Sequence, residues 1–144
     1  MKMKKIIIAS ILLLTGVFGF NLNAFAAWSG WQKESLGHTA RVYTDASNYS
    51  SRASTVDWKI EKKGSGTLYY TAGVYKKRSG GGYTDTNLVQ RGSFKTVTPM
   101  KSFNVKSIRN KTGKGSYVIQ VDCYTDSAKN HYVGTFQSAA FNIK

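Results

Sequence analysis

The sequence predicts an all-β protein, a single antiparallel β-sandwich of about seven to eight strands, with a small β-barrel as the alternative. Three observations predict this class. Apolar and polar residues alternate with a period of two in several segments, glycine-containing turns separate those segments at short intervals, and almost no stretch shows helical periodicity. The 144 residues suffice for one domain, and a hydrophobic fraction of 41% argues against wholesale disorder.

The N-terminus has the pattern of a secretory signal peptide. Residues 1–5 carry three lysines, residues 6–20 form an uncharged and mostly apolar run, and Ala24 and Ala26 are small residues suited to cleavage after position 26. A retained membrane anchor is the alternative, but the run is shorter than the roughly 20 residues that a spanning helix needs. We therefore expect residues 1–26 to be a cleaved signal and residues 27–144 to be one basic domain. That domain is expected to be secreted, extracellular or held non-covalently at the cell surface.

The expected mature domain is strongly cationic. Removal of residues 1–26 takes away three lysines and no acidic residue, which leaves 118 residues with 18 basic and 7 acidic side chains, a net charge of +11. That exceeds the magnitude of roughly 2–8 that keeps a small domain soluble. A polyanionic partner is therefore favoured over solubility alone: a wall polymer, an anionic lipid surface, extracellular DNA or an acidic polysaccharide.

The clearest alternation lies in residues 54–62, where Val56, Trp58 and Ile60 face one way and polar residues face the other. Residues 64–66 form a glycine turn, and residues 67–76 alternate again. This pattern predicts a hairpin of two strands with one dry and one solvated face.

The remaining elements follow in the same manner. Strands are expected at residues 39–44, 88–90, 93–98, 102–109, 117–124 and 133–143, with breaks at Gly92 and Pro99. Turns are expected at residues 79–82, 110–115 and 126–130. In the last strand, one face is expected to be shared by Val133, Thr135, Gln137, Ala139, Phe141 and Ile143. Residues 27–36 are less regular and fit a short leading strand or an arm.

Few residues are suited to catalysis. The lone Cys123 shares a strand face with apolar residues, which favours a buried thiol over a reactive one. His38 and His131 match no metal or triad spacing. Asp57 and Glu61 would lie roughly 13 Å apart on one strand, too far for a glycosidase pair. We therefore expect no catalytic residues, no metal site and no cofactor.

Tyrosines and basic turns are the candidate binding features. Tyrosine has an apolar ring and a polar tip that suit half-wet surfaces, and lysines and arginines gather at three expected turns. The candidate ligand-binding residues are Lys62, Lys63, Tyr69, Tyr75, Lys76, Lys77, Arg78, Tyr83, Arg109, Lys111 and Lys114. The alternative is ordinary loop charge that protects strand edges from aggregation. Trp28 and Trp31 either pack at one end of the fold or form a stacking platform for sugar rings or lipid.

These features favour a secreted, non-enzymatic protein that binds an anionic surface, either a cell-wall glycopolymer or an anionic membrane. One alternative is an antimicrobial or toxin-like protein that acts on the envelope of other cells. Another is a wall or polysaccharide hydrolase, which would need a histidine beside two carboxylates. A nucleic-acid partner is less favoured, because the chain is expected to be exported and shows no recognition element.

Overall fold

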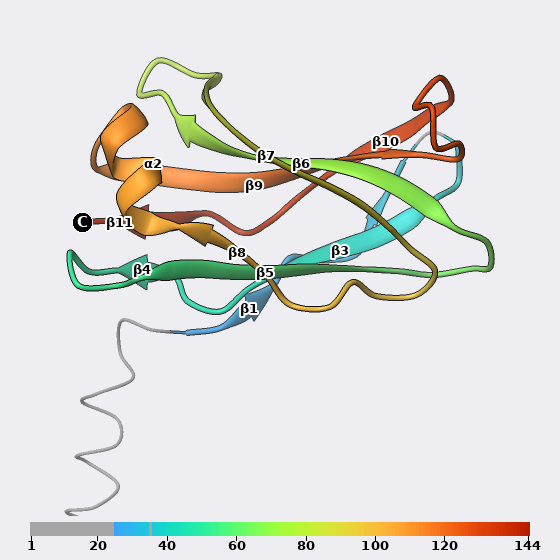
Figure 1. Cartoon of the computed structure of the whole chain (residues 1–144), viewed down its shortest axis with the longest axis horizontal. Helices are drawn as coiled ribbons and strands as arrows, with labels where there is room; N and C mark the ends of the chain where they lie inside the picture. Colours follow the sequence, from blue (N-terminus) through green and yellow to red (C-terminus); the bar gives the residue numbers. More distant parts are fainter. Residues whose placement is uncertain (1–24, 35) are drawn as a thin grey trace, which may run out of the picture.

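The computed structural model describes residues 25–34 and 36–144, and in this part of the chain the strands form two facing sheets with no closed barrel (Figure 1). The expected β-sandwich is confirmed. The expected signal peptide, residues 1–26, falls almost entirely on residues outside those described. None of the helices in the described residues is long and apolar enough to span a membrane.

The first sheet has the strand order β1–β3–β5–β8, with β2 also paired to β3. Its strands are β1 (Ala27–Trp28), β2 (Gln32–Lys33), β3 (Thr39–Thr44), β5 (Thr55–Lys62) and β8 (Lys101–Asn104). All pairs in this sheet are antiparallel.

The second sheet has the order β4–β11–β9–β6–β7, with β10 also paired to β9. Its strands are β4 (Asn48–Tyr49), β6 (Leu68–Lys77), β7 (Tyr83–Phe94), β9 (Gly115–Tyr124), β10 (Tyr132–Gln137) and β11 (Phe141–Ile143). The β11–β4 pair is parallel and the others are antiparallel. A short helix, α2 (Val105–Thr112), follows β8 at one end of the sandwich (Figure 1).

Aromatic side chains fill the core between the sheets. Trp58 of β5 is fully buried, stacks on Phe103 with ring centroids 6.1 Å apart, and meets Tyr70 of the second sheet edge-on at 5.8 Å. The Trp58 indole Nε1 donates a hydrogen bond of 3.0 Å to Gln90 Oε1. Burial of one such ring contributes about 3 kcal/mol, and the hydrogen bond to Gln90 means that the buried indole N–H is paired.

The expected hairpin of residues 54–62 and 67–76 is wrong in its pairing. Both strands form, but β5 lies in the first sheet and β6 in the second (Figure 1). Each has one buried face, and the two faces pack against each other across the core, as the Trp58–Tyr70 contact shows. In a hairpin both apolar faces would lie on the same side of one sheet, and another part of the chain would have to pack over them. The loop of residues 63–67 therefore crosses from one sheet to the other.

The expected strand at residues 102–109 is wrong in its second half, which forms α2. Asn104 is extended and its Oδ1 accepts a hydrogen bond of 2.8 Å from the Ser107 amide, which caps the helix. Val105 and Ile108 are buried at helical spacing. The helix also takes in the first half of the expected turn at residues 110–115 and ends at Gly113, whose φ of 79° suits glycine.

The expected strands at residues 88–90 and 93–98 are not two separate strands. Residues 88–90 and 93–94 lie in the single long strand β7, which has no break at Gly92, and residues 95–98 lie beyond its end. The Tyr70 ring covers that position, so a Cβ there would lie 2.7 Å from Tyr70 Oη. Beyond β7 the chain crosses to the first sheet, where Thr96 O accepts a hydrogen bond from the Lys62 amide.

The expected strand at residues 133–143 is divided into β10 and β11. Between them Ser138 is buried, and its hydroxyl accepts a hydrogen bond from the Ile119 amide at 2.9 Å. A register shift after Tyr132 brings Phe136 into the core. The six residues expected to share one face of a single strand therefore differ in burial: Val133, Phe141 and Ile143 are buried, whereas Thr135, Gln137 and Ala139 are half-buried.

The close contact at Gly92 predicts an unequal effect of two alanine substitutions. We expect Gly92→Ala to lower the free energy of unfolding by about 1–3 kcal/mol, because the new methyl group forces the Tyr70 ring to move. Gly80→Ala is the matched control, since no atom lies within 4 Å of a Cβ at that position. It should change stability by less than about 0.5 kcal/mol. Urea denaturation measures both, and equal effects would contradict the packing described.

A candidate polyanion-binding surface

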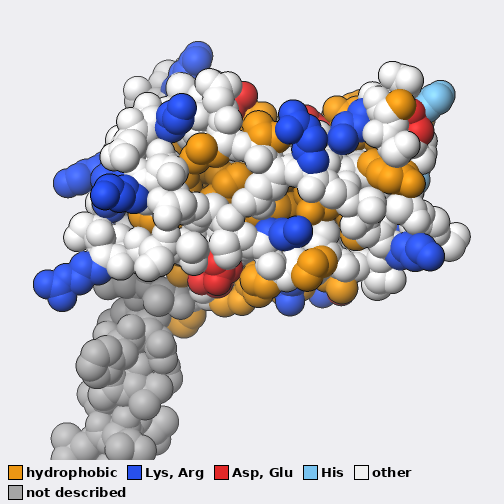
Figure 2. All heavy atoms as spheres, in the orientation of Figure 1, with side chains coloured by type: hydrophobic (Ala, Val, Ile, Leu, Met, Phe, Trp, Pro, Cys, Tyr) orange, Lys and Arg blue, Asp and Glu red, His pale blue; other side chains and the backbone are white. Residues whose placement is uncertain are grey.

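Two of the three expected basic turns meet at one end of the sandwich. Lys76, at the end of β6, donates a hydrogen bond of 2.7 Å from Nζ to the carbonyl of Thr112, at the end of α2. A Cβ on Gly115 would lie 2.7 Å from Lys76 Cε, so the two segments are in direct contact. We call this region the cationic end; it comprises Lys76, Lys77, Arg78, Lys106, Arg109, Lys111 and Lys114. In Figure 2, lysine and arginine side chains project from the end that carries α2 in Figure 1.

Among the described residues, no aspartate or glutamate side chain forms an ion pair with the cationic end. The ion pairs of the described residues are Arg41–Glu61 at 2.7 Å and His131–Asp126 at 3.4 Å, both elsewhere. Lys77, Arg78, Lys106, Lys111 and Lys114 are exposed. An exposed cluster of one sign produces a positive potential that attracts anions from a distance.

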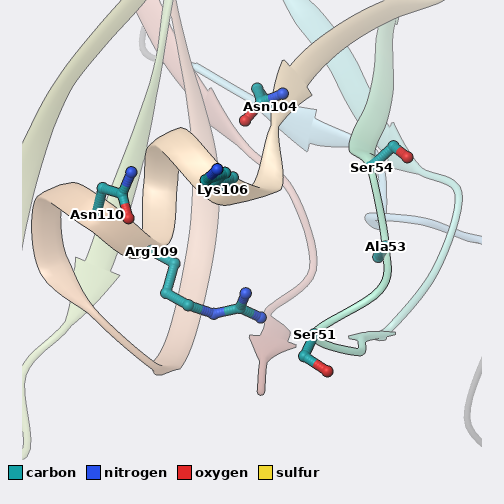
Figure 3. A pocket seen from close by; sticks show the side chains of 7 residues that line it. All are labelled: Ser51, Ala53, Ser54, Asn104, Lys106, Arg109 and Asn110. Atoms are coloured by element: carbon teal, nitrogen blue, oxygen red, sulfur yellow. The ribbon is translucent and has the colours of Figure 1, made fainter.

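A pocket of about 560 Å³ opens at the cationic end between α2 and the loop that joins β4 to β5 (Figure 3). It is lined by Ser51, Ala53, Ser54, Asn104, Lys106, Arg109 and Asn110. The Arg109 side chain extends from α2 toward Ser51, and its Nη2 donates a hydrogen bond to the main-chain oxygen of Lys144 (Figure 3). Its Nε is buried and has no hydrogen-bond partner among the described residues.

The third basic turn lies at the opposite end. Lys62 is buried, and its Nζ donates hydrogen bonds to the carbonyls of Gly64 at 2.9 Å and Ser65 at 3.3 Å. Desolvation lowers the pKa of this ammonium group. Lys63 is exposed, and its Nζ lies 4.5 Å from the ring centroid of Trp31. Lys62 therefore closes the turn after β5, and neither lysine belongs to the cationic end.

The candidate tyrosines belong to the second sheet. Tyr69 and Tyr75 are half-buried, and Tyr83 is exposed at the start of β7, where it pairs in register with Lys77. Burial is the main cause that raises the pKa of Tyr75, and the nearby carboxylates of Asp85 and Asp122 add to it. Tyr83 thus borders the cationic end, whereas Tyr75 shares its face with acidic groups.

The sequence did not reveal a row of cation–π contacts on the outer face of the first sheet. The Arg41 Cζ lies 4.2 Å from the ring centroid of Trp28 and 4.5 Å from that of Trp31. The Lys59 Nζ lies 5.2 Å from Trp28 and 5.0 Å from Tyr43. We call these residues, together with Lys63, the cation–π row.

The cation–π row ties residues 28–31 to β3 and β5. Trp28 is half-buried and Trp31 is 39% exposed, so both indoles pack on the sheet and neither is fully covered. Each ring has cations of the protein itself over it, Arg41 and Lys59 at Trp28 and Arg41 and Lys63 at Trp31. The period-two alternation of β3 and β5 is a sequence signal that places Arg41 and Lys59 on the solvated face. The position of the tryptophans has no such signal, because it depends on the pairing of β1 with β3.

Histidine, cysteine and carboxylate side chains are the remaining groups that were considered for catalysis. His131 Nδ1 lies near the single carboxylate of Asp126, whereas a hydrolase was expected to need two. In the part of the chain that the structure describes, no cluster of three or more His, Cys, Asp and Glu side chains could hold a metal ion. Cys123 is fully buried, and burial raises the pKa of its thiol to about 12, with a smaller effect from Asp122.

Comparison with known proteins places the chain in a family. The family described as the YqgA MG2 macroglobulin domain matches residues 24–144. The chain belongs to this family. It is 33% identical over 122 residues to the "Cell wall-binding protein YqgA" of Bacillus subtilis (strain 168), and the alignment covers 83% of each protein. No solved structure matches the chain. The YqgA MG2 match takes in all the strands of both sheets, so the cationic end and the cation–π row both lie within the family's domain.

The cation–π row predicts a stability role for Arg41. We expect Arg41→Ala to lower the free energy of unfolding by about 1–2 kcal/mol, because it removes the guanidinium from two indoles and from Glu61. The exposed Arg91 is the control, and Arg91→Ala should change stability by less than about 0.5 kcal/mol. Thermal unfolding followed by circular dichroism measures the difference. If the two variants unfold alike, the row contributes nothing to stability.

The environment of Cys123 predicts an unreactive thiol. Since burial raises its pKa to about 12, the thiolate is scarce in the folded protein at pH 8. We expect a disulfide reagent such as DTNB to leave the native protein unmodified at that pH and to label one thiol in denaturant. Rapid stoichiometric labelling of the native protein would show that this face of β9 is open to solvent.

Proposed function

We propose that this protein binds an anionic polymer of the cell wall, without catalysis, through its cationic end. The observation that carries the proposal is the convergence of two basic segments, distant in the sequence, at one end of the sandwich, where no aspartate or glutamate of the described residues pairs with them. The YqgA relative, whose name describes a cell wall-binding protein, supports the wall as the target. We further propose that residues 1–26 are removed on export and that residues 27–144 act outside the cell.

Binding would begin with long-range attraction. The exposed cations raise the local concentration of a polyanion, and salt weakens this effect because charges more than about 8–10 Å apart are screened at physiological ionic strength. At contact, lysine and arginine form charge-assisted hydrogen bonds with phosphate or carboxylate oxygens. The proposed contact residues are Lys76, Lys77, Arg78, Lys111 and Lys114, with Tyr83 at the border and Arg109 in the pocket. Lys62, Lys63, Tyr69 and Tyr75 lie outside this surface.

The fold suits a binding role because the surface rests on rigid elements. Below α2, the buried Tyr117 hydroxyl lies 2.7 Å from the Thr112 hydroxyl and donates to the Gly113 carbonyl. Burial raises the pKa of Tyr117, so this hydroxyl stays protonated and holds the end of the helix. Cations presented from a fixed helix and a fixed strand end lose less conformational entropy on binding than cations on a mobile tail.

The test compares two variants that remove the same charge from different places. Lys77→Gln/Lys111→Gln/Lys114→Gln removes three cations from the cationic end. Lys33→Gln/Arg91→Gln/Lys95→Gln is the control and removes three exposed cations from other parts of the surface. We expect the first variant to bind purified cell walls about tenfold more weakly at low salt, and the control to bind nearly as the wild type.

Co-sedimentation with walls at low and high salt measures this difference, and anionic vesicles provide a second arm. Equal weakening by the two variants would show that charge acts diffusely. Absence of wild-type retention on walls at low salt would overturn the proposal. Retention on vesicles but not on walls would assign the surface to membranes instead.

A further inference from the structure

The pocket at the cationic end has a lining suited to an anion. Its donors come from two sides: Lys106, Arg109 and Asn110 lie on α2, and Ser51 and Ser54 lie on the loop between β4 and β5 (Figure 3). No aspartate or glutamate is among the lining residues. The pocket lining therefore combines a guanidinium, an ammonium, amides and hydroxyls without an aspartate or glutamate side chain.

Arg109 is held in place but is not fully paired. Its backbone carbonyl accepts the capping hydrogen bond from Gly113, and its Nη2 donates to the Lys144 main-chain oxygen. A guanidinium has five N–H donors in a rigid fork, and the Nε of Arg109 is buried and lacks an acceptor in the described residues. Since Nε itself is covered, the Nη groups of the fork are the donors that an anionic oxygen in the pocket would bond.

We infer that this pocket is a subsite for one phosphate group, with Arg109 and Lys106 as its charged ligands. A phosphate group presents oxygens in three dimensions, which matches donors on two opposite walls. A planar carboxylate would be satisfied by the guanidinium fork alone. The inference rests on the proposed function in that a wall polymer with phosphodiester units supplies the group.

The direct test is an NMR titration of the full domain with glycerol phosphate, with glycerate as the carboxylate control at equal ionic strength. We expect a saturable shift of the Arg109 Nε–H resonance and of the Ser51 amide with glycerol phosphate, and a weaker effect with glycerate. An absent shift, a shift that does not saturate, or equal binding of both probes would overturn the inference.

Two variants separate the pocket from the general charge. Lys106 lines the pocket and is exposed, whereas Lys95 is exposed elsewhere on the surface and does not line it. We expect Lys106→Gln to weaken glycerol phosphate binding about fivefold and Lys95→Gln to leave it nearly unchanged. Similar weakening by both would show that glycerol phosphate responds to overall charge. Thermal unfolding confirms that both variants are folded.

Wall co-sedimentation distinguishes the failure of this inference from the failure of the proposed function. Wild-type retention on walls without a phosphate-induced shift overturns the subsite and leaves the proposed function standing. A saturable phosphate shift without retention on walls overturns the proposed function and leaves a site for small phosphate esters. Retention on walls that Lys106→Gln reduces more than Lys95→Gln supports both.

Discussion

The packing of β5 against β6 across the core is the constraint on which the rest of the structure depends. Each strand has one dry face, and those faces are buried together around Trp58, Phe103 and Tyr70. Because β5 and β6 follow each other in the chain yet oppose each other without pairing, the chain builds two sheets. The dry faces of these two strands are buried in the core, and their outer faces and the turns at their ends carry polar and charged groups.

The same constraint distributes the charge. The turn after β5 and the turn after β6 lie close in sequence, yet the length of β6 places them at opposite ends of the molecule (Figure 1). The helix α2 then brings a second basic segment to the end of β6, where Lys76 contacts Thr112. At the other end, Lys63 joins the cation–π row with Trp31. The cationic end thus presents exposed lysines and arginines to solvent. At the opposite end, Lys62 and Lys63 contact the protein's own carbonyl groups and the Trp31 ring.

Sequence patterns predicted where strands form better than they predicted which strands pair with each other. The alternation that indicated strands at residues 54–62 and 117–124 was correct, because a half-buried strand has a strict period of two. The helix α2 was missed because two buried residues in eight give too short a periodic signal. The bulge after Tyr132 and the Tyr70 ring over Gly92 are tertiary features without a local signature. The basic turns were visible in the sequence. Which of them lie together in space depends on the strand order, which the sequence did not reveal.

The central claim is that a polyanion binds at one end of the sandwich and not over its whole surface. Mapping of backbone amide shifts during titration with a soluble poly(glycerol phosphate) fragment tests this claim most directly. The structure predicts shifts confined to the β6–β7 turn, α2 and the loop between β4 and β5, all of which fade at high salt. Shifts spread evenly over both sheets, or centred on the cation–π row, would contradict it.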